Sequence, residues 1–289
     1  EAIRRWDNGE KKELLERLSK HKSSEIRLLS LEIIGRYDDS IQVLSKLRND
    51  SEPEVAKRAW IVSLRQYPDN QFREIADDGL NSNFVNVRRA VVESAIDRGI
   101  EQLVLKGLGD SSPVVISKSI EAISSESLEI DKIRDFLVHS SPLVRSSAYR
   151  RIYSEDKLTI EDTKLIISNH SSETMEVIIE VYSGSLDWGS EEILTLLMEV
   201  PSDSLIPRLI RNSPSIEVDS IRAKLLLGKC NDIRKMRYLE DLIGRNFGGE
   251  TLASVIKISE EMDEGPVRSM ALEVLNDRNT LGKGEVSNE

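Results

Sequence analysis

A short phrase of residues recurs along the chain at a nearly constant spacing, and this repeat restricts the possible folds more than any other feature. It is clearest in Asp50-Ser-Glu-Pro-Glu-Val55, Asp110-Ser-Ser-Pro-Val-Val115 and His139-Ser-Ser-Pro-Leu-Val144. Its closing apolar position, the anchor, recurs at Ile26, Val55, Val87, Val115, Val144 and Met175, with separations of 29, 32, 28, 29 and 31 residues. A unit of this length cannot bury its apolar face alone, so the pattern predicts units that stack on one another.

Each phrase has the composition of a helix start. Pro113 and Pro142 stand at the first helical position, where the missing N–H costs nothing. Side chains that can cap a helix by accepting a backbone N–H precede the helices, at Ser24, Asn83, Ser112, Ser141 and Ser172. A small or β-branched residue follows each anchor by four positions, which extends one apolar stripe, at Ser30, Ala59, Val91, Ser119 and Ala148. A shorter apolar helix pattern precedes each phrase, so each unit is predicted to be a helix, a tight turn and a second helix.

The phrase resembles the Asp-x-x-Pro-x-Val-Arg turn of HEAT repeats, especially the short type called PBS-lyase HEAT-like repeats, over residues 10–185. The resemblance implies an all-α fold, a right-handed α-α superhelix (a HEAT-like, armadillo-like solenoid) of about seven to nine helix pairs. It also implies a structural ladder of hydrogen bonds between successive repeats, made by Asp50, Asp110, Arg27, Arg88 and Arg145. Histidine occupies the aspartate position at His21, His139 and His170, which departs from the family's pattern.

The repeat predicts three regions along the chain. Residues 1–185 are expected to form regular HEAT-like repeats, and residues 186–278 irregular C-terminal helical repeats continuous with the same solenoid. The irregular helices are expected near 203–211, 216–229, 232–246 and 250–263, with a last helix from Pro266 to about Asn276. Residues 279–289 are polar and contain glycine, so we expect a disordered tail. The sequence opens at Glu1 and not at Met, so we expect that an upstream part has been removed, for which a signal peptide and a preceding domain are both open.

Charge and composition exclude several classes of protein. The net charge is −11, and residues 161–289 carry 24 acidic and 14 basic side chains, so most of the excess lies there. This part of the chain would repel phosphate, which disfavours nucleic acid as a partner. The single cysteine, Cys230, excludes an internal disulfide or a cysteine-rich zinc site and favours the reducing cytoplasm. No apolar run approaches the ~18 residues that a membrane-spanning helix needs.

The histidines, the cysteine and the large aromatic residues are the candidates for a chemical role, and we favour a structural role for most of them. The three histidines share one repeat position, so stacking could build a metal or proton site, but we favour turn residues that hydrogen-bond a helix end. Cys230 has no histidine nearby in sequence, and no His-Glu-x-x-His, Walker or Gly-x-Ser-x-Gly motif occurs. Trp60 and Tyr149 share one repeat position and are predicted in or near the core. Trp6 and Trp188 are expected to cap the core ends, or one of them to anchor a partner. We therefore predict no catalytic residue, no metal and no cofactor.

The second helix of each unit gives the best functional lead. In HEAT-like solenoids these helices line the concave face, and the positions two and six after the anchor point outward, at Lys57, Arg89, Glu93, Glu121 and Arg150. A groove of mixed charge suits an acidic helix or tail of another protein. The first hypothesis is therefore a non-enzymatic scaffold that binds a partner segment there, although a solvated face without a partner stays open. The resemblance leaves two alternatives: an alkylpurine DNA glycosylase or other nucleic-acid-binding HEAT protein, and a pigment-protein lyase or chaperone-like subunit.

Overall fold

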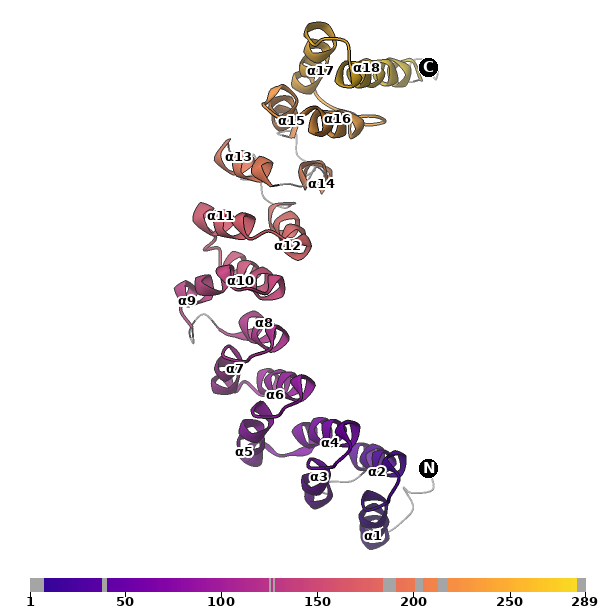
Figure 1. Cartoon of the computed structure of the whole chain (residues 1–289), viewed down its shortest axis with the longest axis vertical. Coiled ribbons are helices and arrows are strands. Elements are labelled where there is room, and N and C mark those ends of the chain that lie inside the picture. Colours follow the sequence, from indigo (N-terminus) through magenta and orange to yellow (C-terminus); the bar gives the residue numbers. More distant parts are fainter. Residues whose placement is uncertain are drawn as a thin grey trace. The chain divides into compact units, whose positions relative to one another are not determined.

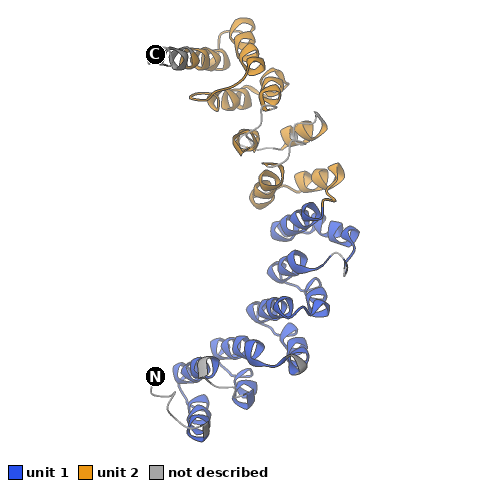
Figure 2. Cartoon of the chain, turned by 180° about the vertical axis from the view of Figure 1, so that it is seen from behind, with its two compact units in different colours: residues 1–155 blue, residues 156–289 orange. Residues whose placement is uncertain are grey.

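The computed structural model describes residues 8–37, 41–124, 126, 128–183, 191–200, 205–212 and 218–284. Every regular element within these ranges is a helix, so the all-α expectation is confirmed. The chain divides into two compact units, unit 1 with residues 1–155 and unit 2 with residues 156–289 (Figure 2). None of the described helices is both long enough and apolar enough to cross a membrane.

Unit 1 is a succession of helix pairs that follow one another in chain order (Figure 1). The first helices of the pairs are α1 (Asn8–Ser19), α3 (Ile41–Leu47), α5 (Asp69–Leu80), α7 (Glu101–Gly107) and α9 (Ile130–Arg134), the last continuing into the 3₁₀ helix η2 (Asp135–Val138). The second helices are α2 (Ser24–Tyr37), α4 (Pro53–Gln66), α6 (Val85–Asp97), α8 (Pro113–Ala122) and α10 (Pro142–Ser154). Each second helix packs on its own first helix and on the neighbouring second helices of unit 1. The second helices therefore form one layer and the first helices another.

Unit 2 is also built from pairs, although its sequence repeat is irregular. The helices are α11 (Ile160–Ser168), α12 (Ser172–Ser183), α13 (Glu191–Glu199), α14 (Leu205–Asn212), α15 (Val218–Leu227), α16 (Asp232–Glu240), α17 (Gly249–Glu261) and α18 (Pro266–Gly284). First helices contact first helices, as α15 does α17, and second helices contact second helices, as α16 does α18. The helices of unit 2 thus form two groups, α11 to α14 and α15 to α18, in each of which first helices pack on first and second helices on second.

The last helix is longer than the sequence indicated. Helix α18 continues past Asn276 to Gly284, because no proline or glycine interrupts the chain before Gly282. The expected tail from Asn279 is therefore helical over its first six residues, and residues 285–289 lie outside the described part of the chain.

The anchors form the centre of the core in unit 1. Val55, Val87, Val115 and Val144 are fully buried, whereas Ile26 and Met175, the first and last anchors of the series, are half-buried. The small or β-branched residues four positions after the anchors have no exposed surface, namely Ser30, Ala59, Val91, Ser119 and Ala148. This apolar stripe is the one that the sequence predicted, and its small side chains leave room for the neighbouring helices.

The two aromatic residues predicted in or near the core are buried or half-buried. Tyr149 is fully buried on α10, as predicted. Trp60 is half-buried on α4, and the Arg48 guanidinium carbon lies 4.6 Å from the centroid of its ring. The expectations for Trp6 and Trp188 fall on residues outside the described ranges.

Close packing of the layers makes Gly107 a sensitive position. A Cβ atom at this residue, the last of α7, would lie 2.2 Å from Ser119 Oγ on α8 and 2.8 Å from Val92 Cγ2 on α6. We expect Gly107→Ala to lower the free energy of unfolding by about 1–3 kcal/mol, because Val92 is fully buried and has no space to move.

Chemical denaturation followed by circular dichroism would measure this loss. Gly109→Ala is the matched control, since a Cβ there meets its nearest atom, Lys106 O, at an ordinary 3.7 Å. Equal effects of the two substitutions would contradict the packing argument.

Candidate functional site

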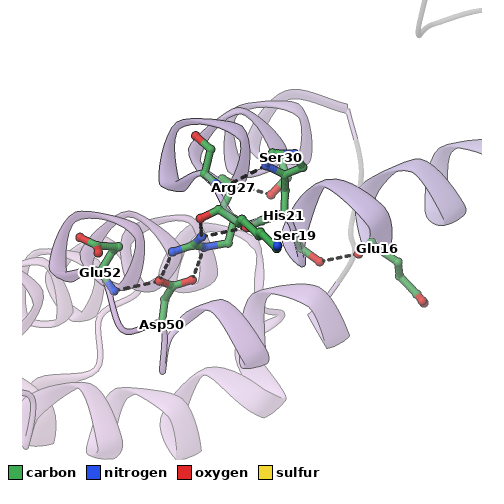
Figure 3. Close-up of polar contacts among 9 residues, drawn as sticks. Glu16, Ser19, His21, Arg27, Ser30, Asp50 and Glu52 are labelled. Atoms are coloured by element: carbon green, nitrogen blue, oxygen red, sulfur yellow. Dashed lines mark hydrogen bonds and ion pairs between the residues drawn. The ribbon is translucent and has the colours of Figure 1, made fainter.

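The turn between α1 and α2 is joined to the turn between α3 and α4 by one arginine. Arg27 on α2 donates from Nε and Nη2 to Asp50 Oδ2 and Oδ1, at 2.7 and 2.8 Å (Figure 3). Its Nη1 donates to the carbonyl oxygens of His21 and Lys22, at 2.9 and 3.0 Å. The planar guanidinium matches the carboxylate with two parallel hydrogen bonds. It therefore ties its own turn to the turn of the next helix pair.

The same arrangement recurs two helix pairs further along the chain. Arg88 on α6 donates from Nε and Nη2 to Asp110 Oδ2 and Oδ1, at 2.7 and 3.0 Å, and from Nη1 to Ser82 O at 2.8 Å. The side chains of Arg88 and Asp110 are only 11% and 7% exposed, so water competes little for the pair. The hydrogen bond with Asp110 raises the pKa of the Arg88 guanidinium.

The aspartates also hold the start of the following helix. Asp50 Oδ1 accepts the backbone N–H of Glu52 at 2.9 Å, and Asp110 Oδ1 accepts that of Ser112 at 2.7 Å. Burial of Asp50 disfavours its charge, but the hydrogen bonds from Arg27 and Glu52 outweigh this effect and lower the pKa of the carboxyl group. Each aspartate thus connects a turn with the preceding helix pair.

Arg145 makes the same contacts with its own turn. Its Nη1 donates to the carbonyl oxygens of His139 and Ser140, at 2.8 and 3.0 Å. The structure therefore brings together the predicted ladder residues Arg27 and Asp50, and Arg88 and Asp110, and places Arg145 at the equivalent position on α10.

The intervening pairs have no arginine at this position. Ala56 and Ile116 follow their anchors, and the next turns then carry Ser82 and His139 where the others carry aspartate. Both aspartates thus follow a helix pair that carries an arginine after its anchor, whereas the turn after Arg145 carries His170. This pairing of arginine and aspartate is visible in the sequence and supports a structural role for Asp50 and Asp110.

The predicted side-chain caps are wrong at three of these turns. Ser112 and Ser141 precede their helices as expected, but neither side chain accepts a capping hydrogen bond. The residue before α6 is Phe84 and not Asn83. The side chain two positions before the cap accepts the backbone N–H of the cap residue instead, which holds the turn. This side chain is that of Asp110 before α8, His139 before α10 and Ser82 before α6.

Two histidines take the place of aspartate in this role. His21 Nδ1 accepts the N–H of Ser23 and His139 Nδ1 that of Ser141, both at 3.0 Å, so each ring carries its proton on Nε2. His170 differs, because its Nδ1 contacts the carbonyl oxygen of Ile167 at 3.1 Å. Within the described ranges, no group of three or more His, Cys, Asp or Glu side chains could hold a metal ion.

The layer of second helices contains a cavity between α4 and α6. Its volume is about 330 Å³, and it is lined by Ile61, Arg65, Asn86, Arg89, Ala90, Glu93, Ser94 and Asp97. Arg89 Nε lies 3.4 Å from Glu93 Oε1, and their side chains are 46% and 42% exposed. The lining therefore combines a small apolar surface with two arginines and two carboxylates.

Two of the five predicted partner-binding residues, Arg89 and Glu93, line this cavity. The other three lie on helices of the same layer: Lys57 donates to Glu54 at 2.6 Å, Glu121 accepts from Ser147 Oγ at 3.0 Å, and Arg150 is half-buried on α10. The sequence prediction did not include Arg65 and Asp97. It used the positions two and six after each anchor, whereas these residues lie ten positions after Val55 and Val87, near the ends of their helices.

Comparison with known proteins gives no family. No family model and no curated protein matches the chain. One similar solved structure is the crystal structure of an engineered protein from the Northeast Structural Genomics Consortium, at 16% identity over 92% of this chain and 78% of the other, with a TM-score of 0.29. A likeness this weak carries no conclusion, so the repeat architecture rests on the helix pairs themselves.

Loss of one member of a buried pair is expected to be costly. Arg88→Ala leaves the carboxylate of Asp110 buried without its guanidinium, so we expect the free energy of unfolding to fall by about 2–4 kcal/mol. Arg89→Ala, one residue further and on the exposed side of α6, should change it by less than about 1 kcal/mol. Urea denaturation of both variants tests this, and equal losses would refute the structural role of Arg88.

The lowered pKa of Asp50 makes its contribution depend on pH. Because the folded-state pKa lies below the unfolded value of about 3.9, the stabilisation is present above that value. It is lost as the pH falls through the folded pKa. We expect the difference in unfolding free energy between the natural chain and Asp50→Asn to shrink between pH 7 and pH 2, measured by urea denaturation. A difference that stays constant over this interval would contradict the ion pair.

Proposed function

We propose that this chain is a non-enzymatic scaffold that binds a segment of another protein on the second helices of unit 1, across α4 and α6. The observation that carries the proposal is the cavity of about 330 Å³ with Arg65, Arg89, Glu93 and Asp97 around it. This volume lies at the lower end of the range for ligand pockets, so it suits a few side chains of a protein segment.

The charges around the cavity favour a protein over a nucleic acid. Arg65 and Arg89 can bind carboxylates of an acidic helix or tail, while Glu93 and Asp97 in the same cavity would repel phosphates. The ion pair between Arg89 and Glu93 is exposed, so little free energy is lost when Arg89 exchanges it for a partner's carboxylate. Ile61 and Ala90 offer apolar surface for a side chain between those carboxylates.

We further propose that the helix pairs belong to the HEAT type, with the right-handed superhelix of that family. The turn phrase, with proline at the first position of α4, α8 and α10, supports this assignment. The contacts between successive second helices are closer than those between successive first helices, which supports the second helices of unit 1 as the concave side. The single cysteine supports the cytoplasm as the compartment.

Charge reversal at the cavity is expected to abolish binding. The full chain, immobilised, captures its partner from the native lysate, and the partner is then identified by mass spectrometry and purified. We expect Arg89→Glu to weaken the binding of the purified partner by at least about tenfold, because it places a third carboxylate in the cavity. Titration by fluorescence anisotropy measures the affinity.

Arg73→Glu is the matched control, since Arg73 is an exposed arginine on α5, in the layer of first helices. Equal affinity of the natural chain and Arg89→Glu would contradict the site. Binding of double-stranded DNA that falls steeply between 50 and 200 mM salt would instead favour the nucleic-acid alternative.

A further inference from the structure

Unit 2 contains a cavity that is larger than the one between α4 and α6 and is separate from the sites described above. It has a volume of about 680 Å³ and lies between α13 and the turn that joins α15 to α16. Its lining consists of Leu194, Thr195, Met198, Lys224, Gly228, Lys229, Cys230, Asn231 and Arg234. This volume is in the middle of the range of ligand pockets.

The walls of the cavity are fixed by their own contacts. The Arg234 guanidinium on α16 donates to the carbonyl oxygens of Met198 and Val200, the latter at 2.6 Å, and so ties α16 to the end of α13. Asn231 Oδ1 accepts the N–H of Arg234 at 2.9 Å and caps α16. A Cβ atom at Gly228 would lie 2.9 Å from Lys224 O and 3.9 Å from Met198 Cε, so a side chain there would crowd the wall.

The cavity is basic within a unit that is otherwise strongly acidic. Residues 222–237 carry six basic side chains and one acidic side chain, whereas the rest of unit 2 carries nine basic and 24 acidic ones. Lys224 and Lys229 line the cavity and are exposed. Neither forms an ion pair with any other residue that the structure describes. This concentration of positive charge is complementary to carboxylates and unsuited to a cationic ligand.

Apolar surface lies beside these lysines. Leu194 is buried and Met198 half-buried on the α13 wall. Leu227 and Ile233, which adjoin the lining residues Gly228 and Arg234 in the chain, are 48% and 61% exposed. Both lie outside the lining, on the helices α15 and α16 that flank the cavity. Exposed apolar side chains on these flanking helices favour a ligand that extends beyond the cavity, as a peptide does, over a small molecule inside it.

We propose that this cavity binds an acidic segment of a partner protein. One large apolar side chain of the segment enters the cavity against Leu194 and Met198, and neighbouring carboxylates contact Lys224 and Lys229. This site shares no helix with the cavity between α4 and α6, which belongs to unit 1. The proposal therefore does not depend on the function proposed for that cavity.

A random library of 12-residue peptides displayed on phage, selected on the full chain, tests the proposal. Cys230 lines the cavity and is the chain's single cysteine, so it serves as the reporter of where a peptide binds. We expect a class of enriched peptides with acidic residues next to a large apolar residue. Each synthetic peptide of this class should slow the reaction of Cys230 with a thiol reagent.

Charge variants then test the lysines. We expect Lys224→Glu with Lys229→Glu to lower the affinity for such a peptide by at least about tenfold. Met198→Ala should lower this affinity as well, although it changes no charge. Lys257→Glu is the control, because Lys257 is an exposed lysine of unit 2 on α17, outside the cavity lining. Lys224→Gln with Lys229→Gln gives a milder form of the test should the double reversal unfold, which circular dichroism reports.

Three results would overturn the proposal: enrichment of only neutral or basic peptides, no protection of Cys230, or equal affinity of the lysine variants and Lys257→Glu. Arg89→Glu should leave the affinity of the Cys230-protecting peptides unchanged, since it lies in unit 1. Peptides that bind the α4–α6 cavity instead do not protect Cys230, and their affinity falls in Arg89→Glu. Failure at one site is therefore distinguishable from failure at the other.

Discussion

Each helix pair of this chain has to share its apolar stripe with the next pair, and this requirement governs the rest of the structure. The anchors Val55, Val87 and Val115 are buried because second helices pack on both sides of their own. Small residues four positions later allow that approach, and Gly107 allows α7 to approach α6 and α8. The core is therefore a series of shared interfaces, and the free energy of each pair depends on its neighbours.

The sequence predicted the helix pairs because their two determinants are local. An anchor with a small residue four positions later defines one face of a helix, and the proline of the phrase marks its start. The capping role was assigned to the serines, although the acceptor that takes it lies only two positions before the cap, as Asp110 does before Ser112. The part that is not local is the ion pair of Asp110 with Arg88, 22 residues earlier in the chain. Only the packed helices show that geometry.

The cavities could be predicted only in part. Arg89 and Glu93 were identified because they lie on the outward side of α6, which the helical period defines. The cavity of unit 2 depends on α13 and the α15–α16 turn, which are 30 or more residues apart in a region of irregular repeats. Gly228, Lys229 and Cys230 belong to no motif that would indicate a ligand site. The basic composition of residues 222–237 was the signal that could have indicated this site.

The alternation of arginine with alanine or isoleucine after the anchors means that the chemical period of unit 1 is two helix pairs, about 60 residues, and not one. Arg27 and Arg88 join charged interfaces, whereas the interface between α8 and α10 carries a hydrogen bond between Ser117 and Ser147. A chain shortened by two pairs would set Arg27 against Asp110 and keep every interface matched. A chain shortened by one pair would set it against Ser82 and lose the ion pair that the removal of two pairs keeps.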